Sequence, residues 1–78
     1  MMYMIKDELQ IIGERIRVKR EEKGYTLEEM SDMVDMEYEH LRHVEDPHCN
    51  SFLTDDMIKR LAAALDVDVD YFLAGLVE

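Results

Sequence analysis

Three histidines and the only cysteine lie close together, at positions 40, 43, 48 and 49, and these residue types can bind a metal ion. His40 and His43 are three residues apart, so they would share one face of a helix. Their spacing from His48 and Cys49 matches no closed zinc motif. We therefore interpret the four as separate side chains and predict neither a metal site nor a cofactor.

No grouping of catalytic residues is apparent. The sequence lacks a glycine-rich phosphate-binding loop, and nothing in it resembles a nucleophile–base–acid triad. Adjacent acids such as Asp55 and Asp56 stand at an expected helix start, where the helix dipole favours anions. We predict that the chain is not an enzyme.

The charge balance is strongly acidic. Nineteen acidic and nine basic residues give a formal net charge of −10, which opposes contact with phosphate backbones and anionic membranes. A single cysteine cannot form a disulfide within the chain, and no apolar stretch approaches the length of a membrane span. The first residues also lack the basic and apolar regions of a signal peptide. We predict a cytoplasmic protein that does not bind membranes.

Length and composition indicate one all-α domain. The 78 residues suit a single domain over positions 1–78, and 47% of them are hydrophobic. Strong helix formers dominate, whereas glycine and proline together number four.

Apolar spacing, capping residues and helix breakers predict five helices. We expect them from about Ile5 to Lys23, from the N-cap Thr26 to near Asp35, from about Glu37 to Glu45, from the N-cap Thr54 through Leu65, and from the N-cap Asp68 into the apolar run 73–77. Thr26 and Glu29 match a capping box, and hydrophobic staples are expected in the pairs Tyr25–Met30, Leu53–Ile58 and Val67–Phe72. The expected core residues are Leu9, Ile12, Ile16, Leu27, Met30, Val34, Leu41, Val44, Met57, Ile58, Leu61, Ala62 and Leu65, with Tyr38 beside them.

The connection between the second and third helices is three or four residues long. A turn this short makes the two helices cross steeply, which is the geometry of a DNA-binding helix-turn-helix. Four segments in order then resemble the Cro/C1 repressor-type (XRE-like) helix-turn-helix family over about 60 residues. The segments are Ile12-Gly13-Glu14-Arg15-Ile16-Arg17, Arg20-Glu21-Glu22-Lys23-Gly24-Tyr25-Thr26-Leu27-Glu28-Glu29-Met30, Leu41-Arg42-His43-Val44-Glu45 and the run from Leu61 to Leu73.

This resemblance implies a five-helix lambda-repressor-like DNA-binding domain, and a transcriptional regulator that acts as a homodimer. It also implies an ion pair between Arg20 and Glu45 that holds the third helix against the first. The sequence departs from the family pattern at several positions. Leu27 stands where the family has a phosphate-binding glutamine, Ser31 replaces an alanine, and Asp35 and Pro47 replace turn glycines.

The base-reading positions that the resemblance implies are Glu37, Tyr38, Glu39 and His43. Further candidate DNA contacts are Arg42, Arg15, Arg17, Lys19 and, in the loop after the third helix, Asn50. Lys59 and Arg60 would add to a basic footprint if they converged on the same face.

The third helix carries the wrong charge for a nucleic-acid contact. Five carboxylates and one basic side chain, Arg42, lie between Asp35 and Asp46. Each carboxylate that faces DNA opposes the phosphate field, although one can accept from cytosine. Two hypotheses therefore remain: a DNA-binding regulator, and a helix-turn-helix scaffold that has lost DNA binding and uses its acidic third helix to bind a protein partner.

Overall fold

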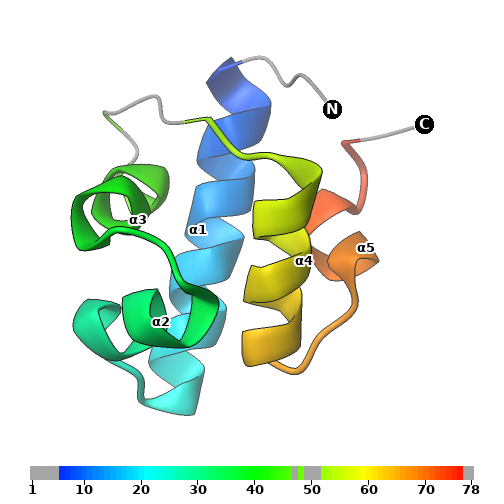
Figure 1. Cartoon of the computed structure of the whole chain (residues 1–78). Helices are drawn as coiled ribbons and strands as arrows, with labels where there is room; N and C mark the ends of the chain where they lie inside the picture. The colour runs from blue at the N-terminus through cyan, green and yellow to red at the C-terminus, as the bar shows by residue number, and fades with distance from the viewer. Residues whose placement is uncertain (1–5, 47, 49–51, 77–78) are drawn as a thin grey trace.

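The computed structural model describes residues 6–46, 48 and 52–76. These residues form five helices and no strand, which confirms the predicted all-α class (Figure 1). The helices are α1 (Lys6–Lys23), α2 (Leu27–Val34), α3 (Tyr38–Glu45), α4 (Asp55–Ala64) and α5 (Val69–Leu73). None of them is long and apolar enough to cross a membrane.

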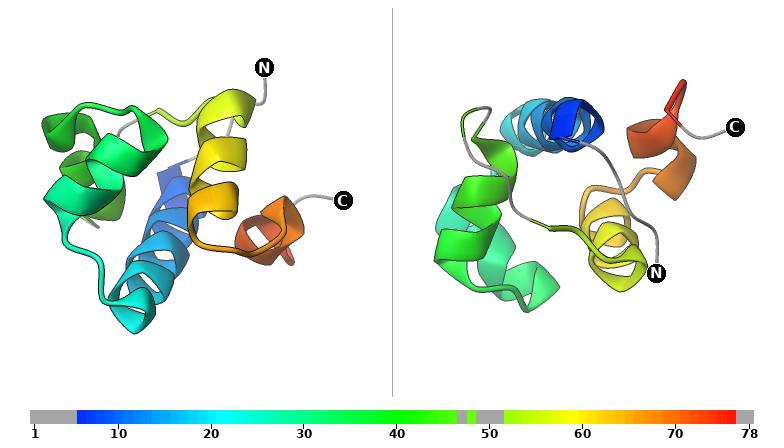
Figure 2. Two further views of the ribbon diagram at one scale, coloured as in Figure 1. Left: turned by 60° about the horizontal axis from the view of Figure 1, so that its bottom comes forward. Right: turned by 90° about the horizontal axis from the view of Figure 1, so that it is seen from above.

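The long helix α1 separates two pairs of shorter helices. Both views of Figure 2 place α2 and α3 to one side of α1, and α4 and α5 to the other. The packed pairs include α1 with α3, α1 with α5, and α2 with α4. Helix α4 therefore closes the core against the helix-turn-helix, while α3 and α5 lie on different sides of α1.

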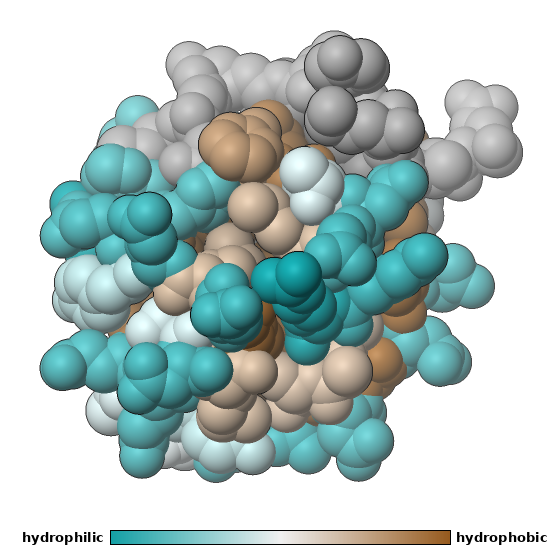
Figure 3. All heavy atoms as spheres, in the orientation of Figure 1, coloured by the Kyte–Doolittle hydropathy of each residue, from teal (hydrophilic) through white to brown (hydrophobic). Residues whose placement is uncertain are grey.

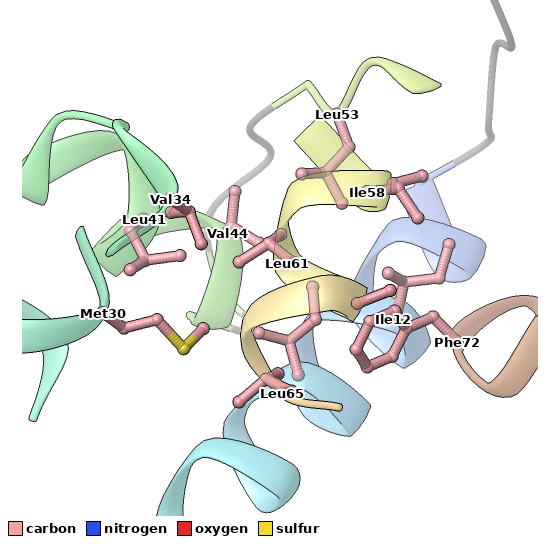
Figure 4. Packing of buried hydrophobic residues seen from close by; sticks show 12 residues of the cluster. Ile12, Met30, Val34, Leu41, Val44, Leu53, Ile58, Leu61, Leu65 and Phe72 are labelled. Atoms are coloured by element: carbon pink, nitrogen blue, oxygen red, sulfur yellow. The ribbon is translucent and has the colours of Figure 1, made fainter. Parts of the chain in front are cut away.

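One apolar cluster joins all five helices. Ile12, Ile16, Met30, Leu41, Leu61, Leu65 and Phe72 are each fully buried in it. In Figure 4 the side chain of Leu61 lies between those from α2 and α3 and those from α1 and α5. The helical spacing of apolar residues predicted most of this cluster. Phe72, which was expected only as one half of a staple, is the largest side chain in it.

The capping residues act largely as expected. The Thr26 amide donates to Glu29 Oε1 over 2.8 Å, and the Glu29 amide donates to Thr26 Oγ1 over 3.0 Å, so the capping box is confirmed. Thr54 caps α4 by accepting from the amide of Met57. Asp68 occupies the N-cap position of α5 but makes no side-chain capping bond.

Two predictions about the helices are corrected, and a third stays untested. Tyr38 is not a core residue, because its side chain projects from the first turn of α3 and the residue is 41% exposed. Helix α5 ends at Leu73, and the chain then turns through Gly75, whose φ is +82°. The expected start of the first helix at Ile5 lies outside the described residues.

The α1–α3 contact is unusually close at Gly13. A Cβ atom at this position would collide with the backbone carbonyl of Val44 on α3. Since that oxygen belongs to the helix backbone, a side-chain rotation cannot relieve the clash. Glycine at position 13 therefore sets how near the two helices approach.

Next to this contact, Arg20 of α1 binds Glu45 at the end of α3. Arg20 Nε donates to Glu45 Oε2 over 2.8 Å, and Nη2 donates to Oε1 over 2.9 Å, which is a two-pronged geometry. The Arg20 side chain is 12% exposed and the Glu45 side chain 5%. The bond to Glu45 raises the pKa of Arg20 despite its burial, so the guanidinium stays charged. The ion pair implied by the family resemblance is present.

Gly13→Ala should destabilise the protein, although alanine has the higher helix propensity. We expect the unfolding free energy to fall by about 1–3 kcal/mol, because the added methyl group pushes α3 away from α1. Urea unfolding would measure the change. The control is Glu14→Ala on the exposed side of α1, which should alter stability by no more than about 0.5 kcal/mol. A stabilised Gly13→Ala variant would show that α3 does not approach α1 this closely.

Glu45→Gln should leave the Arg20 guanidinium buried without its counter-charge. We expect a loss of about 3 kcal/mol in unfolding free energy, which is a large part of the stability of a domain this size. The double variant Arg20→Met with Glu45→Met should recover most of that loss, because it removes both charges together. A loss below about 1 kcal/mol for Glu45→Gln would mean that the pair contributes only what an exposed ion pair does.

Candidate nucleic-acid interface

Helix α3 presents one face to the core and another to solvent. Leu41, Val44 and Glu45 are buried. The solvent face carries the five predicted contact residues of this helix, of which His43 is half-buried and the others are exposed. They are Glu37, Tyr38, Glu39, Arg42 and His43. These predicted residues are therefore accessible around α3, although Glu37 and Tyr38 line different hollows.

Arg42 is held within this face by its neighbours. Glu39 Oε1 accepts from Arg42 Nη2 over 2.7 Å and from Nε over 3.2 Å. Arg42 Nη2 also lies 3.1 Å from His43 Nε2. The bond from Arg42, helped by its positive charge, lowers the pKa of the Glu39 carboxyl, so Glu39 stays ionised at neutral pH.

Two of the three predicted cations of α1, Arg15 and Lys19, contact groups at α5. Arg15 Nη1 donates to the carbonyls of Phe72 and Ala74, at the end of α5. Lys19 Nζ lies 4.9 Å from the centre of the Tyr71 ring on α5 and 3.0 Å from Glu22 Oε1, and the bond to Glu22 raises its pKa.

Since α5 and α3 lie on different sides of α1, Arg15 and Lys19 are directed away from the reading helix. Arg17 pairs within α1, at 3.4 Å from Glu21 and 3.8 Å from Glu14. Arg15 and Lys19 are therefore not on the α3 side of α1, whereas Arg17 lies on the same stripe of α1 as Gly13 and Arg20, between carboxylates that bind it.

The other candidate contacts lie around the loop after α3 and on α4. Arg60 pairs with Asp56 at 2.8 Å, and its Nη1 is 3.5 Å from the carbonyl of Val34 at the end of α2. Arg60 therefore reaches the helix-turn-helix, whereas Lys59 lines a hollow between α4 and α5. Asn50 lies outside the described residues.

The negative charge of the chain is concentrated on the helix-turn-helix. Eight acidic residues and one basic residue, Arg42, lie between Leu27 and Asp46. In Figure 3 hydrophilic side chains cover much of the left-hand surface, over α2 and α3. A hollow of about 500 Å³ is lined by Glu28, Ser31, Asp32 and Tyr38, so two carboxylates and an aromatic ring share its wall.

The histidines do not form a metal cluster among the described residues. His40 Nε2 lies 2.9 Å from the carbonyl oxygen of Phe52, and the two rings meet edge to face with centres 4.6 Å apart. This contact joins α3 to the segment before α4, and sequence reasoning missed it. Phe52 had no periodic pattern around it, so no signal in the sequence could have assigned its partner. Cys49 lies outside the described residues.

The turn between α2 and α3 has the backbone shape that normally takes glycine. Asp35 has φ 55° and ψ 47°, in the left-handed region. The Met36 amide donates to the Ser31 carbonyl over 3.0 Å, which closes the end of α2. This is the position at which the family pattern has a glycine, so the chain keeps the turn geometry with a different residue.

The five helices and the short α2–turn–α3 unit define a helix-turn-helix domain. A similar fold occurs in SinR, described as the master regulator for biofilm formation, in a crystal structure with DNA. The TM-score is 0.73 and the sequences are 31% identical, over 80% of this chain and 97% of that chain. No protein-family model matches the sequence, and no curated protein matches it. The chain belongs to the helix-turn-helix family that includes SinR.

Asp35→Gly should stabilise the protein. Left-handed backbone costs an L-residue free energy that glycine avoids, and the Asp35 carboxylate adds negative charge at the C-terminal end of α2. We expect a gain of about 1 kcal/mol, or a rise of about 4–8 °C in melting temperature. Asp35→Asn is the control, because it removes the charge and keeps the side chain, and it should give a smaller gain. A destabilised Asp35→Gly variant would contradict this account of the turn.

Proposed function

We propose that this chain is a Cro/C1 repressor-type transcriptional regulator that binds DNA through α3 and acts as a homodimer. The observation that carries the proposal is the placement of α3. Gly13 and the Arg20–Glu45 pair hold its inner face against α1, while its outer face stays open to solvent. The similarity to SinR, whose structure contains DNA, supports the same use of the fold.

In this proposal α3 enters the major groove. Tyr38, Glu39, Arg42 and His43 meet base edges, and Glu37 lies at the start of the helix. Arg60 of α4, whose Nη1 lies 3.5 Å from the Val34 carbonyl at the end of α2, would meet a phosphate, and Asn50 remains a candidate contact from the loop. The protein acts in the cytoplasm and catalyses no reaction.

The acidic surface sets the strength of binding. Phosphate neutralisation supplies most non-specific affinity, and here few cations face outward on the helix-turn-helix. We therefore expect weak binding to mixed DNA. Discrimination between sequences must then come from base contacts.

A second candidate function is supported by the hollow beside Tyr38. Glu28 and Asp32, one turn apart on α2, line this hollow together with the Tyr38 ring, and two carboxylates with an aromatic ring suit a lysine or arginine side chain. On this alternative the scaffold has lost DNA binding, and the acidic α2–α3 surface binds the basic surface of a protein partner.

The double variant Glu37→Lys with Glu39→Lys separates the two functions. If α3 faces DNA, reversing two charges should raise affinity for mixed duplex DNA by at least about tenfold at about 50 mM salt. Fluorescence anisotropy with a labelled duplex would measure the change, and sedimentation of the same samples would give the oligomeric state.

The matched control reverses two charges elsewhere, with Asp68→Lys and Asp70→Lys on exposed positions at the start of α5. A similar gain for both double variants would mean that α3 is not the DNA-facing element. If the native protein is a folded dimer and binds no duplex at micromolar concentration, the regulator function fails and the protein-binding function is favoured.

A further inference from the structure

Arg42 is the only permanently cationic side chain of the helix-turn-helix. No other lysine or arginine occurs between Leu27 and Asp46. Its side chain is 44% exposed on the outer face of α3, on the face opposite the buried Leu41 and Val44. If α3 meets DNA, any strong cationic contact from the helix to a base has to come from this residue.

The guanidinium is held in place before any ligand arrives. Glu39 Oε1 accepts from both Arg42 Nε and Nη2, so one carboxylate oxygen binds one edge of the guanidinium plane. His43 Nε2 lies 3.1 Å from the same Nη2. For that contact to be a hydrogen bond, the histidine proton must sit on Nδ1, so that Nε2 accepts. An arginine held at two points loses less conformational freedom on binding than a free one.

Resting on the proposed function, we propose that Arg42 reads a guanine in the major groove and that Glu39 is the positioning residue for it. Guanine presents two acceptors there, N7 and O6. Glu39 occupies the Nε–Nη2 edge of the guanidinium, so Nη1 and the second hydrogen of Nη2, which His43 must release, would donate to them. The other exposed side chains of α3 cannot do this. The carboxylates of Glu37 and Glu39 only accept hydrogen bonds. The Tyr38 hydroxyl can donate one, and each ring nitrogen of His43 can donate at most one. The chemistry of this face therefore selects a guanine-containing site.

Glu39 then has an effect on base discrimination that the other acids on this surface lack. Removing an ordinary carboxylate weakens repulsion of the phosphates and raises affinity for every sequence alike. Removing Glu39 does this too, but it also releases the Arg42 guanidinium. Discrimination between guanine and other bases should fall, which repulsion alone would not change.

The experiment begins with selection of binding sites from random duplexes by the full chain at about 50 mM salt. Each guanine of the selected site is then replaced in turn by 7-deazaguanine, which lacks the N7 acceptor, or by inosine, which keeps N7 and O6. We expect one guanine at which the first replacement weakens binding about tenfold and the second leaves it unchanged. In Arg42→Ala this sensitivity should disappear.

Glu39→Gln tests the positioning role against Glu28→Gln, an equal charge change on the exposed surface of α2. Both variants should bind unrelated duplexes more tightly than the native protein. The ratio of affinities for the selected site and for its guanine-to-adenine variant should fall severalfold in Glu39→Gln. In Glu28→Gln it should stay as in the native protein.

Each other result overturns a distinct statement. If no guanine of the selected site loses its sensitivity to N7 removal in Arg42→Ala, the guanine assignment is overturned and DNA binding is left intact. Equal ratios in Glu39→Gln and Glu28→Gln would overturn the positioning role alone. If neither the native chain nor Glu37→Lys with Glu39→Lys binds any duplex, the proposed function fails and the guanine assignment fails with it.

Discussion

The contact between α3 and α1 is the constraint on which the rest of the molecule depends. At Gly13 the two backbones approach so closely that a side chain would not fit, and seven residues further along α1 Arg20 binds Glu45. Because one contact is steric and the other electrostatic, together they set both the distance and the rotation of α3. The face that α3 offers to solvent follows from them. A ligand therefore meets a surface whose orientation is already determined.

Contacts between helices also account for the position of several basic side chains. Arg15 binds carbonyls at the end of α5, Arg20 binds Glu45, and Lys19 lies over Tyr71. In a domain with a small core, such contacts attach the peripheral helices to α1. Cations that stabilise the fold in this way are not available to phosphates. The low outward positive charge is thus connected to the stability of the scaffold and not only to the composition of α3.

Sequence patterns predicted the fold better than the site. Apolar spacing located the core, and Thr26 with Glu29 located the start of α2, because both signals are local. Tyr38 was expected both beside the core and among the base-reading residues, and its position in the first turn of α3 leaves it 41% exposed. The partner of Arg15 at Phe72 lies 57 residues away in the chain. Phe52, which meets His40, lies in an irregular segment before α4. Their contacts depend on how helices pack, which no local pattern records.

The acids of the helix-turn-helix divide into two groups with different physical roles. Glu29 caps α2, Glu45 pairs with Arg20, and Glu39 holds Arg42, so these carboxylates belong to the structure. Glu28 and Asp32 are exposed, and the described hydrogen bonds and ion pairs of the chain include none made by their carboxylates. The second group contributes to the electric field while adding little to the fold. The field over α2 and α3 can therefore change by substitution at these positions without moving α3, so the same scaffold suits either a nucleic acid or a basic protein surface.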